Sequence, residues 1–265
     1  GRVARVLDEM VATGQLVGYV CGVRSRGASE IVAGGSSSIG GPELSEEAVF
    51  PLSSNTKPLG GVLAMRLVEL GVIHPDQPVA EFLPELADLK VLASPGATPD
   101  RTVPVERPVT VRHLLTMSAG FGWAGESPAL VEAMSARGIA PGPFAPTIPP
   151  EEYLVRLAGL PLAGQPGRGW WYHTSSDVLG VLLARAADRP VGVLLEELVT
   201  GPLGLVDTGV TADPDRMPTS YGVGADGAPD PLDTVSRFAG RPVFESLACG
   251  LASTVGDHLT FLDVL

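Results

Sequence analysis

The sequence predicts an α+β chain in which an antiparallel sheet, flanked by helices, lies beside a mainly helical region. The first observation is an amphipathic helical pattern in residues 3–11, followed at once by two segments of β type. The second is a change of character at residue 53, after which helices and long loops prevail. We therefore expect residues 1–52 to form the N-terminal part of an α/β region and residues 53–265 to form the mainly helical region.

The N-terminal region is expected to contain a helix and a β-hairpin. In order, the pattern gives a helix over residues 3–11 that Gly14 ends, a strand over 16–24, a turn over 25–29 and a return strand over 30–33. A two-stranded hairpin is marginal in water unless further strands or another layer cover it. Either helices cover both of its faces or the missing strands come from residues after Leu265. The pattern favours the second arrangement, with only two strands of the sheet in this chain.

The second region is expected to be built from five helices. They cover residues 59–70, 111–116, 178–187, 191–199 and 258–265. Gly71 ends the first helix, and Gly201 with Pro202 ends the fourth. The predicted N-caps are Thr110 for the second helix, Ser175 or Ser176 for the third, and Ser253 or Thr254 for the fifth. Residues 94–108 and 138–150 read as surface loops, and residues 211–245 as irregular. The 33 glycines and 25 prolines follow no fixed period, which excludes a collagen-like chain.

Charge and cysteine content narrow the classes of partner and compartment. A net charge of −12 without a basic run argues against nucleic acid and against an anionic membrane surface. No apolar stretch reaches the 18 or so residues of a membrane span. Cys21 and Cys249 lie in apolar contexts and are expected to be buried, and two cysteines make no disulfide framework. These features favour a reducing compartment, the cytoplasm, although a signal peptide already removed would leave no trace.

The sharpest chemical signal is the S-x-x-K pattern formed by Ser54 and Lys57. At the start of a helix, residues i and i+3 share a face, so a hydroxyl and an amine would point into one pocket. A serine becomes a nucleophile when a base takes its proton, and a lysine can be that base if its surroundings depress its pKa. The bland alternative is an ordinary helix start with a solvent-exposed lysine. Only two of the 18 basic residues are lysines, which makes a chance match less frequent.

A second candidate is the segment 170–177, directly before a predicted helix. Tyr172 could present its hydroxyl to a pocket and relay a proton. The alternative is that Trp170, Trp171 and Tyr172 are packing aromatics.

Five spaced blocks, taken together, resemble the serine β-lactamase and D-Ala-D-Ala carboxypeptidase-like superfamily. The blocks are Phe50–Lys57 with Pro58, Val109–Gly120, Trp171–Thr174 with Ser176–Gly180, Pro202–Thr208 and Gly250–Thr254. The branch related to class C enzymes, which holds many carboxylesterases, is the most similar, and the resemblance runs from about residue 3 to residue 265. It implies a β-lactamase/transpeptidase-like fold.

The resemblance also implies catalytic roles. Ser54 would be the acylated nucleophile, and Lys57 would help to take its proton. Tyr172 matches the tyrosine of the family's Y-x-N element and would be the partner base. The backbone N–H of Ser54 would supply half of the oxyanion hole.

Two departures from the family pattern stand out. Thr174 occupies the third position of the Y-x-N element in place of Asn, and this difference argues against β-lactamase activity. The family's Lys/His-x-Gly motif has no match, and its strand normally lies beyond the position of Leu265. The resemblance therefore implies a chain that lacks the C-terminal strands and helix of the α/β region, and we expect little turnover from a protein that ends at Leu265.

The remaining polar and aromatic residues give weaker signals. Trp123, His173 and Thr174 are the candidates for substrate binding, with core packing as the alternative for Trp123 and for His173. His113 and His258 lie near helix starts, where packing or capping roles are expected. The four histidines have no metal-ligand spacing, and no G-x-S-x-G, G-x-G-x-x-G or P-loop motif occurs, so neither a metal nor another cofactor is expected.

The sequence thus predicts a serine hydrolase that acts through a covalent acyl-enzyme on small carboxylic esters. β-Lactams and D-amino-acid peptides are alternative substrates. A non-catalytic relative that serves as a binding module is the alternative from another class. The oligomeric state and the natural acyl group are not encoded in any pattern recognised here.

Overall fold

The computed structural model describes residues 1–25 and 27–265. By its internal contacts the chain forms two compact units. The first consists of Gly1–Leu52, Thr200–Pro242 and Leu251–Leu265, and the second of Ser53–Val199 and Val243–Gly250. Two segments from the C-terminal part of the chain therefore join the first 52 residues.

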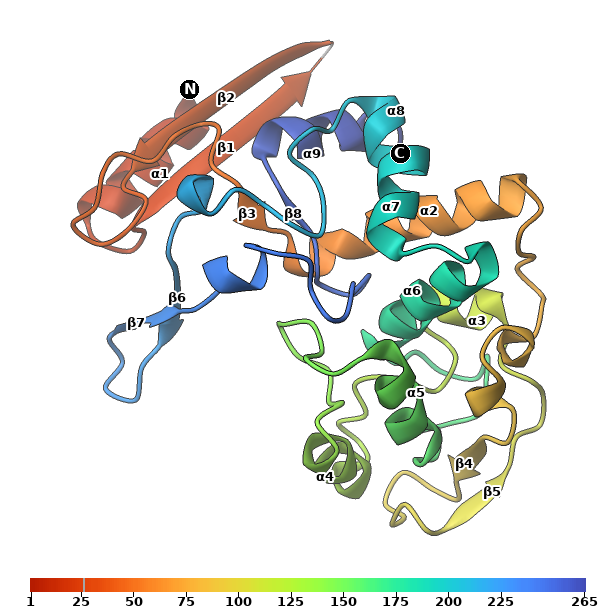
Figure 1. Ribbon diagram of the computed structural model, residues 1–265. Coiled ribbons are helices and arrows are strands. Elements are labelled where there is room, and N and C mark those ends of the chain that lie inside the picture. The colour runs from red at the N-terminus through yellow and green to blue at the C-terminus, as the bar shows by residue number, and fades with distance from the viewer. Residues whose placement is uncertain (26) are drawn as a thin grey trace. The chain divides into compact units, whose positions relative to one another are not determined.

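The first unit is built around the β1–β2 hairpin (Figure 1). Its elements are α1 (Arg2–Ala12), β1 (Gly18–Ser25), β2 (Ala28–Gly35), β3 (Phe50–Pro51), α8 (Gly201–Leu203), β6 (Ser220–Val223), β7 (Pro229–Leu232), β8 (Ala252–Ser253) and α9 (Val255–Leu262). The antiparallel register runs from the pair Gly18 and Gly35 to the pair Ser25 and Ala28, which confirms the predicted hairpin. The predicted turn over residues 25–29 includes Arg26, which lies outside the described residues.

Helices pack on both faces of the hairpin. From β1, Tyr19 donates a hydrogen bond from Oη to Asp8 Oδ1 on α1 at 2.7 Å. Gly22 faces α9, and a Cβ at this position would lie 2.6 Å from Val255 Cγ1 and 2.7 Å from Leu259 Cδ1. Because side chains alternate along a strand, positions 19 and 22 point to opposite faces. α1 and α9 therefore cover different sides of the hairpin.

Further strands occur outside the hairpin, among them β6 and β7 within residues 211–245, which the sequence predicts to be irregular. Three more two-stranded antiparallel pairs occur among the described residues, namely β3–β8, β6–β7 and β4 (Lys90–Leu92) with β5 (Thr102–Pro104). Each strand has only two to four residues, too few for an alternating pattern to be recognised. β7 also contains Pro229 and Pro231, which argue against a strand because proline cannot donate to the ladder.

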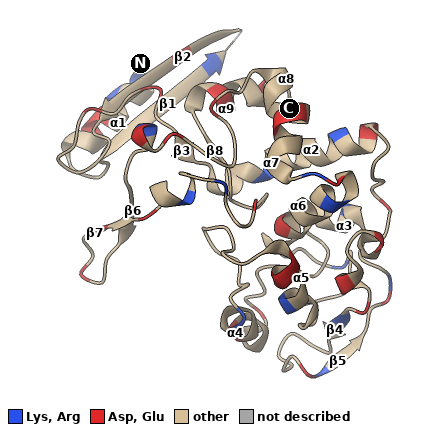
Figure 2. Cartoon of the chain, viewed as in Figure 1, with Lys and Arg blue, Asp and Glu red and all other residues tan. Residues whose placement is uncertain are grey.

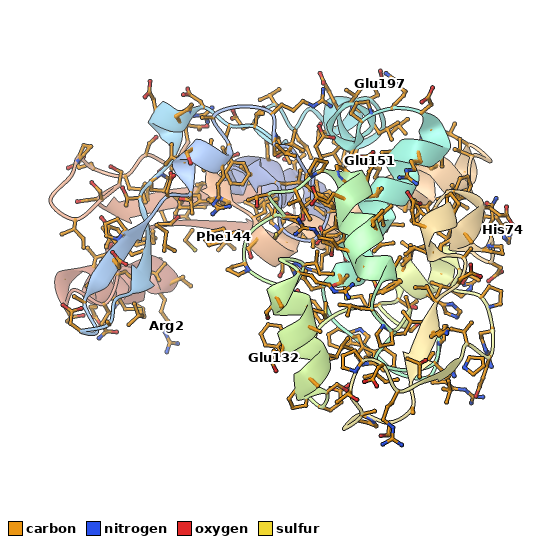
Figure 3. The ribbon with its side chains drawn as sticks, turned by 60° about the horizontal axis from the view of Figure 1, so that its bottom comes forward. Arg2, His74, Glu132, Phe144, Glu151 and Glu197 are labelled. Carbon is orange, nitrogen blue, oxygen red and sulfur yellow. The ribbon has the colours of Figure 1, made fainter. Side chains whose placement is uncertain are left out.

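The second unit is mainly helical. Its helices are α2 (Thr56–Glu69), α3 (Val111–Leu115), α4 (Pro128–Ala136), α5 (Pro150–Ala158), α6 (Thr174–Ala187) and α7 (Val191–Leu195). α6 is central, because α2, α3 and α7 all contact it and its first ten residues are buried on every side. Side chains on the outer helices point outward, as Glu132 on α4 and Glu151 on α5 illustrate (Figure 3).

Two predicted helix ends differ in the structure. α6 begins at Thr174 with His173 as its N-cap, so Ser175 and Ser176 lie inside the first turn and neither of them caps it. The helix that starts at Val191 does not stop before Gly201 and Pro202. It passes through a π-helical turn over Glu196–Thr200 into α8 and ends at Gly204, whose φ is 68°. The wider turn accommodates a proline, which lacks the N–H that continues an α-helix.

The charged residues are scattered. Figure 2 shows Lys and Arg placed singly among Asp and Glu over the described residues, in keeping with the net charge of −12. Within the described ranges, none of the helices combines the length and the apolar character that crossing a bilayer requires.

Thr110 caps α3 as the sequence predicts. Its Oγ1 accepts a hydrogen bond from the His113 N–H at 3.4 Å, and His113 Nδ1 accepts one from the Thr110 N–H at 3.1 Å. We expect Thr110→Ala to lower the free energy of unfolding by about 1 kcal/mol, because one helix donor loses its partner. Urea denaturation measures this, with Thr110→Ser, which keeps the oxygen, as the control. Equal stability of the Ala and Ser variants would contradict the assignment.

Candidate active site

Ser54 and Lys57 lie together at the start of α2. Ser54 belongs to a short 3-10 turn, Ser53–Asn55, that leads directly into the helix. Lys57 Nζ donates to Ser54 Oγ at 3.3 Å. Ser54 is exposed and Lys57 is half-buried, so the hydroxyl faces solvent while the amine lies behind it.

Two further groups hold the Lys57 amine. Its Nζ donates to the carbonyl oxygen of Ala248 at 2.7 Å, and it lies 4.4 Å from the centroid of the Tyr172 ring. A cation over an aromatic face is attracted by the negative potential of the ring. The structure therefore brings Ser54, Lys57 and Tyr172 together, although residues 57 and 172 are far apart in the sequence.

Tyr172 is held by the segment before α6. The indole of Trp171 is buried, and its Nε1 donates to Glu126 Oε1 at 3.0 Å. The Trp123 N–H donates to the Tyr172 carbonyl at 2.9 Å. Gly122 permits this approach, because a Cβ at this position would lie 2.4 Å from the carbonyl oxygen of Tyr172. The φ of Gly122, 139°, also disfavours any residue with a side chain.

The pKa of the Tyr172 phenol is lowered. Burial acts in the opposite direction and is the largest single influence, but hydrogen bonds with Ser54 and Lys57 and the positive charge of Lys57 together outweigh it. A phenol with a lowered pKa gives up its proton more readily at neutral pH. The arrangement can therefore move a proton between a hydroxyl, an amine and a phenol.

Asp177 is a buried residue near Lys57 that the sequence analysis did not assign to the site. Asp177, only 1% exposed, accepts a hydrogen bond from Ser246 Oγ at 2.5 Å. Burial raises the pKa of Asp177 to about 6, and hydrogen bonds from Ser246 and the Ala248 backbone, together with the Lys57 charge, limit the rise. In the sequence, an Asp in the first turn of a helix reads as an exposed residue at the positive end of the helix dipole, and a backbone carbonyl such as that of Ala248 leaves no signal.

His173 is neutral and buried beside this group. The residue is only 6% exposed. Burial, and to a smaller extent the positive charge of Lys57, lowers the pKa of the His173 imidazole to about 4. Its Nε2 lies 3.6 Å from Asp177 Oδ2, too far for a hydrogen bond. Above pH 4 the two residues therefore form no ion pair. Its φ of 91° is a strained conformation for a residue with a Cβ.

The three candidates for substrate binding differ in exposure. Trp123 is 64% exposed, which excludes core packing for its side chain. Thr174 is fully buried in the first turn of α6, and His173 is nearly so. Contact of Thr174 and His173 with the substrate stays a prediction, and the burial of both side chains does not favour it. Trp170, also 64% exposed, stacks on Tyr172 with ring centroids 5.3 Å apart.

Cysteine and histidine positions match the expectations only in part. Cys249 is buried as predicted, but Cys21 is half-buried, because β1 belongs to a two-stranded sheet. His113 has the capping role expected of it. Within residues 1–25 and 27–265, no three His, Cys, Asp or Glu side chains are grouped so that they could hold a metal ion.

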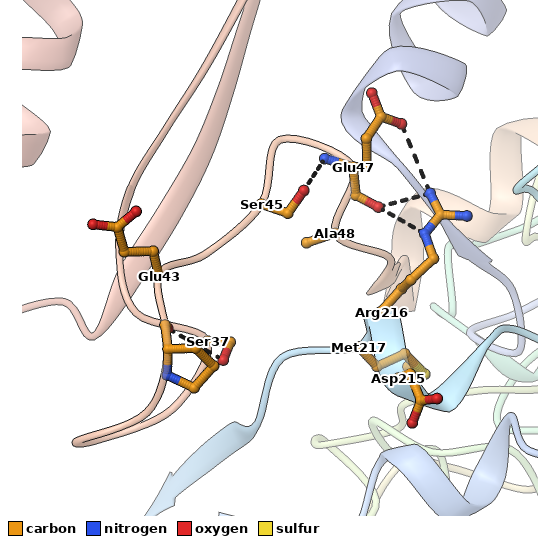
Figure 4. Close-up of a pocket in the computed structure, with 9 residues that line it drawn as sticks. Ser37, Glu43, Ser45, Glu47, Ala48, Asp215, Arg216 and Met217 are labelled. Atoms are coloured by element: carbon orange, nitrogen blue, oxygen red, sulfur yellow. Dashed lines mark hydrogen bonds and ion pairs between the residues drawn. The ribbon is translucent and has the colours of Figure 1, made fainter.

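A separate cavity of about 200 Å³ occurs in the first unit (Figure 4). Glu43, Glu47, Asp215 and Arg216 are among the residues that line it. The guanidinium of Arg216 already binds the Glu47 carbonyl at 2.7 Å and the carboxylate of Asp207. Ser54, Lys57 and Tyr172 belong to the other unit, so this cavity is not the candidate active site.

Comparisons with known proteins point to one family. The family model described as Beta-lactamase matches residues 3–265. Esterase EstB of Burkholderia gladioli is 34% identical over 289 residues, which cover 100% of this chain and 69% of EstB. Protein Rv1367c of Mycobacterium tuberculosis (strain ATCC 25618 / H37Rv) is 32% identical over 234 residues, which cover 85% of this chain and 55% of that protein.

A solved structure shares the fold. EstCE1, described as a hydrolase with promiscuous acyltransferase activity, superposes with a TM-score of 0.83 at 26% identity. The match covers 99% of this chain and 71% of that chain. The predicted family resemblance and fold class are confirmed by these matches.

The buried carboxylate predicts how stability depends on pH. The folded state binds the Asp177 proton more tightly than the unfolded state does, since the pKa rises from 3.8 to about 6. This stabilisation is complete below pH 3.8 and is lost as the pH rises through 6. Asn has no such proton. Relative to the natural protein, Asp177→Asn should gain about 2 kcal/mol in free energy of unfolding between pH 4 and pH 7.

Urea denaturation of both proteins at the two pH values measures this gain. Lys57, His173 and Tyr153 are present in both proteins, so their own effects on stability largely cancel in the difference. A difference between variant and natural protein that is the same at pH 4 and pH 7 would contradict the raised pKa.

Proposed function

Because this chain belongs to the beta-lactamase family, we propose that it is a serine hydrolase that cleaves small carboxylic esters through a covalent acyl-enzyme. The observation that carries the proposal is the meeting of Ser54, Lys57 and Tyr172. Lys57 Nζ lies 3.3 Å from Ser54 Oγ and 4.4 Å from the centre of the Tyr172 ring. The relationship to an esterase at 34% identity supports esters as the substrate class.

In the proposed first step, Ser54 Oγ attacks the ester carbonyl while its proton passes to the Lys57 and Tyr172 pair. The backbone N–H of Ser54, at the start of α2, would stabilise the developing oxyanion. Tyr172 then gives a proton to the departing alcohol, and the acyl group stays on Ser54. In the second step water attacks the acyl-enzyme and the same pair takes up its proton. The bond from the acyl carbon to Ser54 Oγ breaks, the pair returns the proton to Oγ, and the carboxylic acid leaves.

The surroundings of this triad support small esters over amides. Thr174, at the position where the family has an amide side chain, is fully buried in α6. The exposed indole of Trp170 stacks on the Tyr172 ring, and Trp123, whose indole is also exposed, donates its backbone N–H to the Tyr172 carbonyl. We propose that these rings contact the apolar part of the substrate.

Both cysteines are thiols, which supports a reducing compartment such as the cytoplasm.

Acyl transfer is a second candidate function. EstCE1, which shares the fold at a TM-score of 0.83, is described as having promiscuous acyltransferase activity. The chemistry differs from hydrolysis only in the second step, where an alcohol replaces water as the group that attacks the acyl-enzyme.

Covalent labelling tests the nucleophile. A fluorophosphonate should phosphonylate Ser54 with loss of fluoride, and Ser54→Ala in the complete protein should show no adduct by intact-protein mass spectrometry. The matched control is Ser53→Gly, because Ser53 has a φ of 47° that glycine accepts without strain. The control should label like the natural protein. An adduct on the Ser54→Ala variant would remove Ser54 as the nucleophile.

The leaving group tests the role of Tyr172. Tyr172→Phe keeps the ring beneath Lys57 and removes the hydroxyl, so kcat should fall by a factor of about 10² to 10⁴. The fall should be larger for an alkyl ester than for the corresponding p-nitrophenyl ester, because an alkoxide needs a proton to leave and a nitrophenolate does not. Tyr221→Phe, which lies in the first unit, is the control. Equal losses with both esters would argue against proton delivery by Tyr172.

A further inference from the structure

We propose that Asp177 and Ser246 are positioning residues that fix the turn at residues 246–249, so that the Ala248 carbonyl holds the Lys57 amine against Ser54. The inference rests on the proposed function, because it takes Lys57 to belong, with Tyr172, to the pair that accepts the Ser54 proton. It adds to that function two buried side chains that touch neither the substrate nor the reacting hydroxyl.

The first link is the bond between the carboxylate and the hydroxyl. Asp177 Oδ1 accepts from Ser246 Oγ at 2.5 Å, and the two residues are 1% and 0% exposed. The Ala248 backbone also hydrogen-bonds the carboxylate. A hydrogen bond to a charged acceptor in a dry environment is short and strong, so it fixes both partners.

The second link is the closed turn. Ser246 Oγ accepts hydrogen bonds from the Ala248 N–H and the Cys249 N–H, both at 3.1 Å. A hydroxyl has one proton and two acceptor sites, and the two backbone donors use both acceptor sites. Ser246 can then only donate, and a carboxylate, which has no proton to offer when ionised, is the matching partner. Asp177 thus completes the hydrogen bonding of this turn, since its carboxylate at 2.5 Å is a stronger acceptor for the Ser246 proton than the Cys249 sulfur at 3.7 Å.

The third link reaches the site. The Ala248 carbonyl accepts from Lys57 Nζ at 2.7 Å, whereas the bond from Nζ to Ser54 Oγ measures 3.3 Å. The shorter bond determines where the amine lies, because the longer one is at the limit of hydrogen-bond geometry. A shift of the turn would therefore carry Nζ away from Ser54.

The charge of Asp177 serves Lys57 and not His173. Facing the carboxylate are Lys57, His173 and Tyr153, and Cys249 shares the Ser246 hydroxyl. His173 is neutral above pH 4 and beyond hydrogen-bond distance, which excludes an Asp–His dyad. Tyr153 has its pKa raised well above the ordinary value by burial and by the Asp177 charge, so it stays neutral. Lys57 is the partner whose positive charge the carboxylate can stabilise.

The test is the rate at which a fluorophosphonate labels Ser54 in the complete protein. Asp177→Asn keeps an oxygen that accepts from Ser246 and removes the charge, while Ser246→Ala breaks the link to the turn. Each should slow the first-order rate constant of labelling at least tenfold, up to about 10²-fold for a displaced base, with the half-saturating concentration unchanged. The double variant should be no slower than the slower single variant, because the two residues act as one unit.

A lysine-free background shows whether the effect passes through Lys57. In Lys57→Met, neither Asp177→Asn nor Ser246→Ala should slow labelling further. The matched control is Thr208→Val in the first unit, which removes another hydroxyl that donates to a carboxylate, that of Asp257 at 2.9 Å. This control should lose stability in urea and label at the natural rate.

The outcomes separate the two proposals. Labelling that persists in Ser54→Ala contradicts the proposed function. Loss of labelling in Ser54→Ala, combined with natural rates in folded Asp177→Asn, overturns only the positioning role, as does slowing by either variant that persists in Lys57→Met. If Ser246→Ala fails to fold, Asp177→Asn, which preserves volume and hydrogen bonding, decides the question.

Discussion

The placement of the Lys57 amine is the constraint on which the site depends. Its nitrogen is bound to the Ala248 carbonyl at 2.7 Å, to Ser54 Oγ at 3.3 Å and lies 4.4 Å from the centre of the Tyr172 ring. These partners come from the start of α2, the segment before α6 and the turn at residues 246–249 of one compact unit. A long, flexible side chain is costly to order, and three fixed partners offset that cost.

Unfavourable local features are concentrated around this amine. Among the described residues, four non-glycine residues have a positive φ, and three of them lie at or next to the site. Ser53 precedes the proposed nucleophile, and His173 follows Tyr172. The third is Met117, whose carbonyl accepts a hydrogen bond from the Trp171 N–H at 2.8 Å. A buried carboxylate, Asp177, adds an electrostatic cost. Such features persist when the surrounding packing enforces them, and they are enriched at functional sites.

Sequence patterns predicted the elements whose periodicity is long or whose chemistry lies in the side chain. The α1 helix, the β1–β2 hairpin, α2 and α6 are confirmed, as is the family. The pair β6–β7 was missed because its second strand carries two prolines, which pairing tolerates only where their missing N–H groups are not needed. The role of residue 248 could not be predicted, because its contact with Lys57 is made by a backbone carbonyl that every residue possesses.

Burial of position 174 bears on which acyl compounds such a site would accept. An amide substrate presents an N–H that must be paired when it is desolvated, and a site selects for it by offering a polar partner. Here the side chain at that position is enclosed in the first turn of α6, and the exposed indole of Trp170 stacks on Tyr172. An ester has no such N–H, so it brings no hydrogen-bond donor that must find a partner at an aromatic surface. The exposed indole of Trp170 and the burial of Thr174 therefore support the proposed preference for esters with an apolar portion.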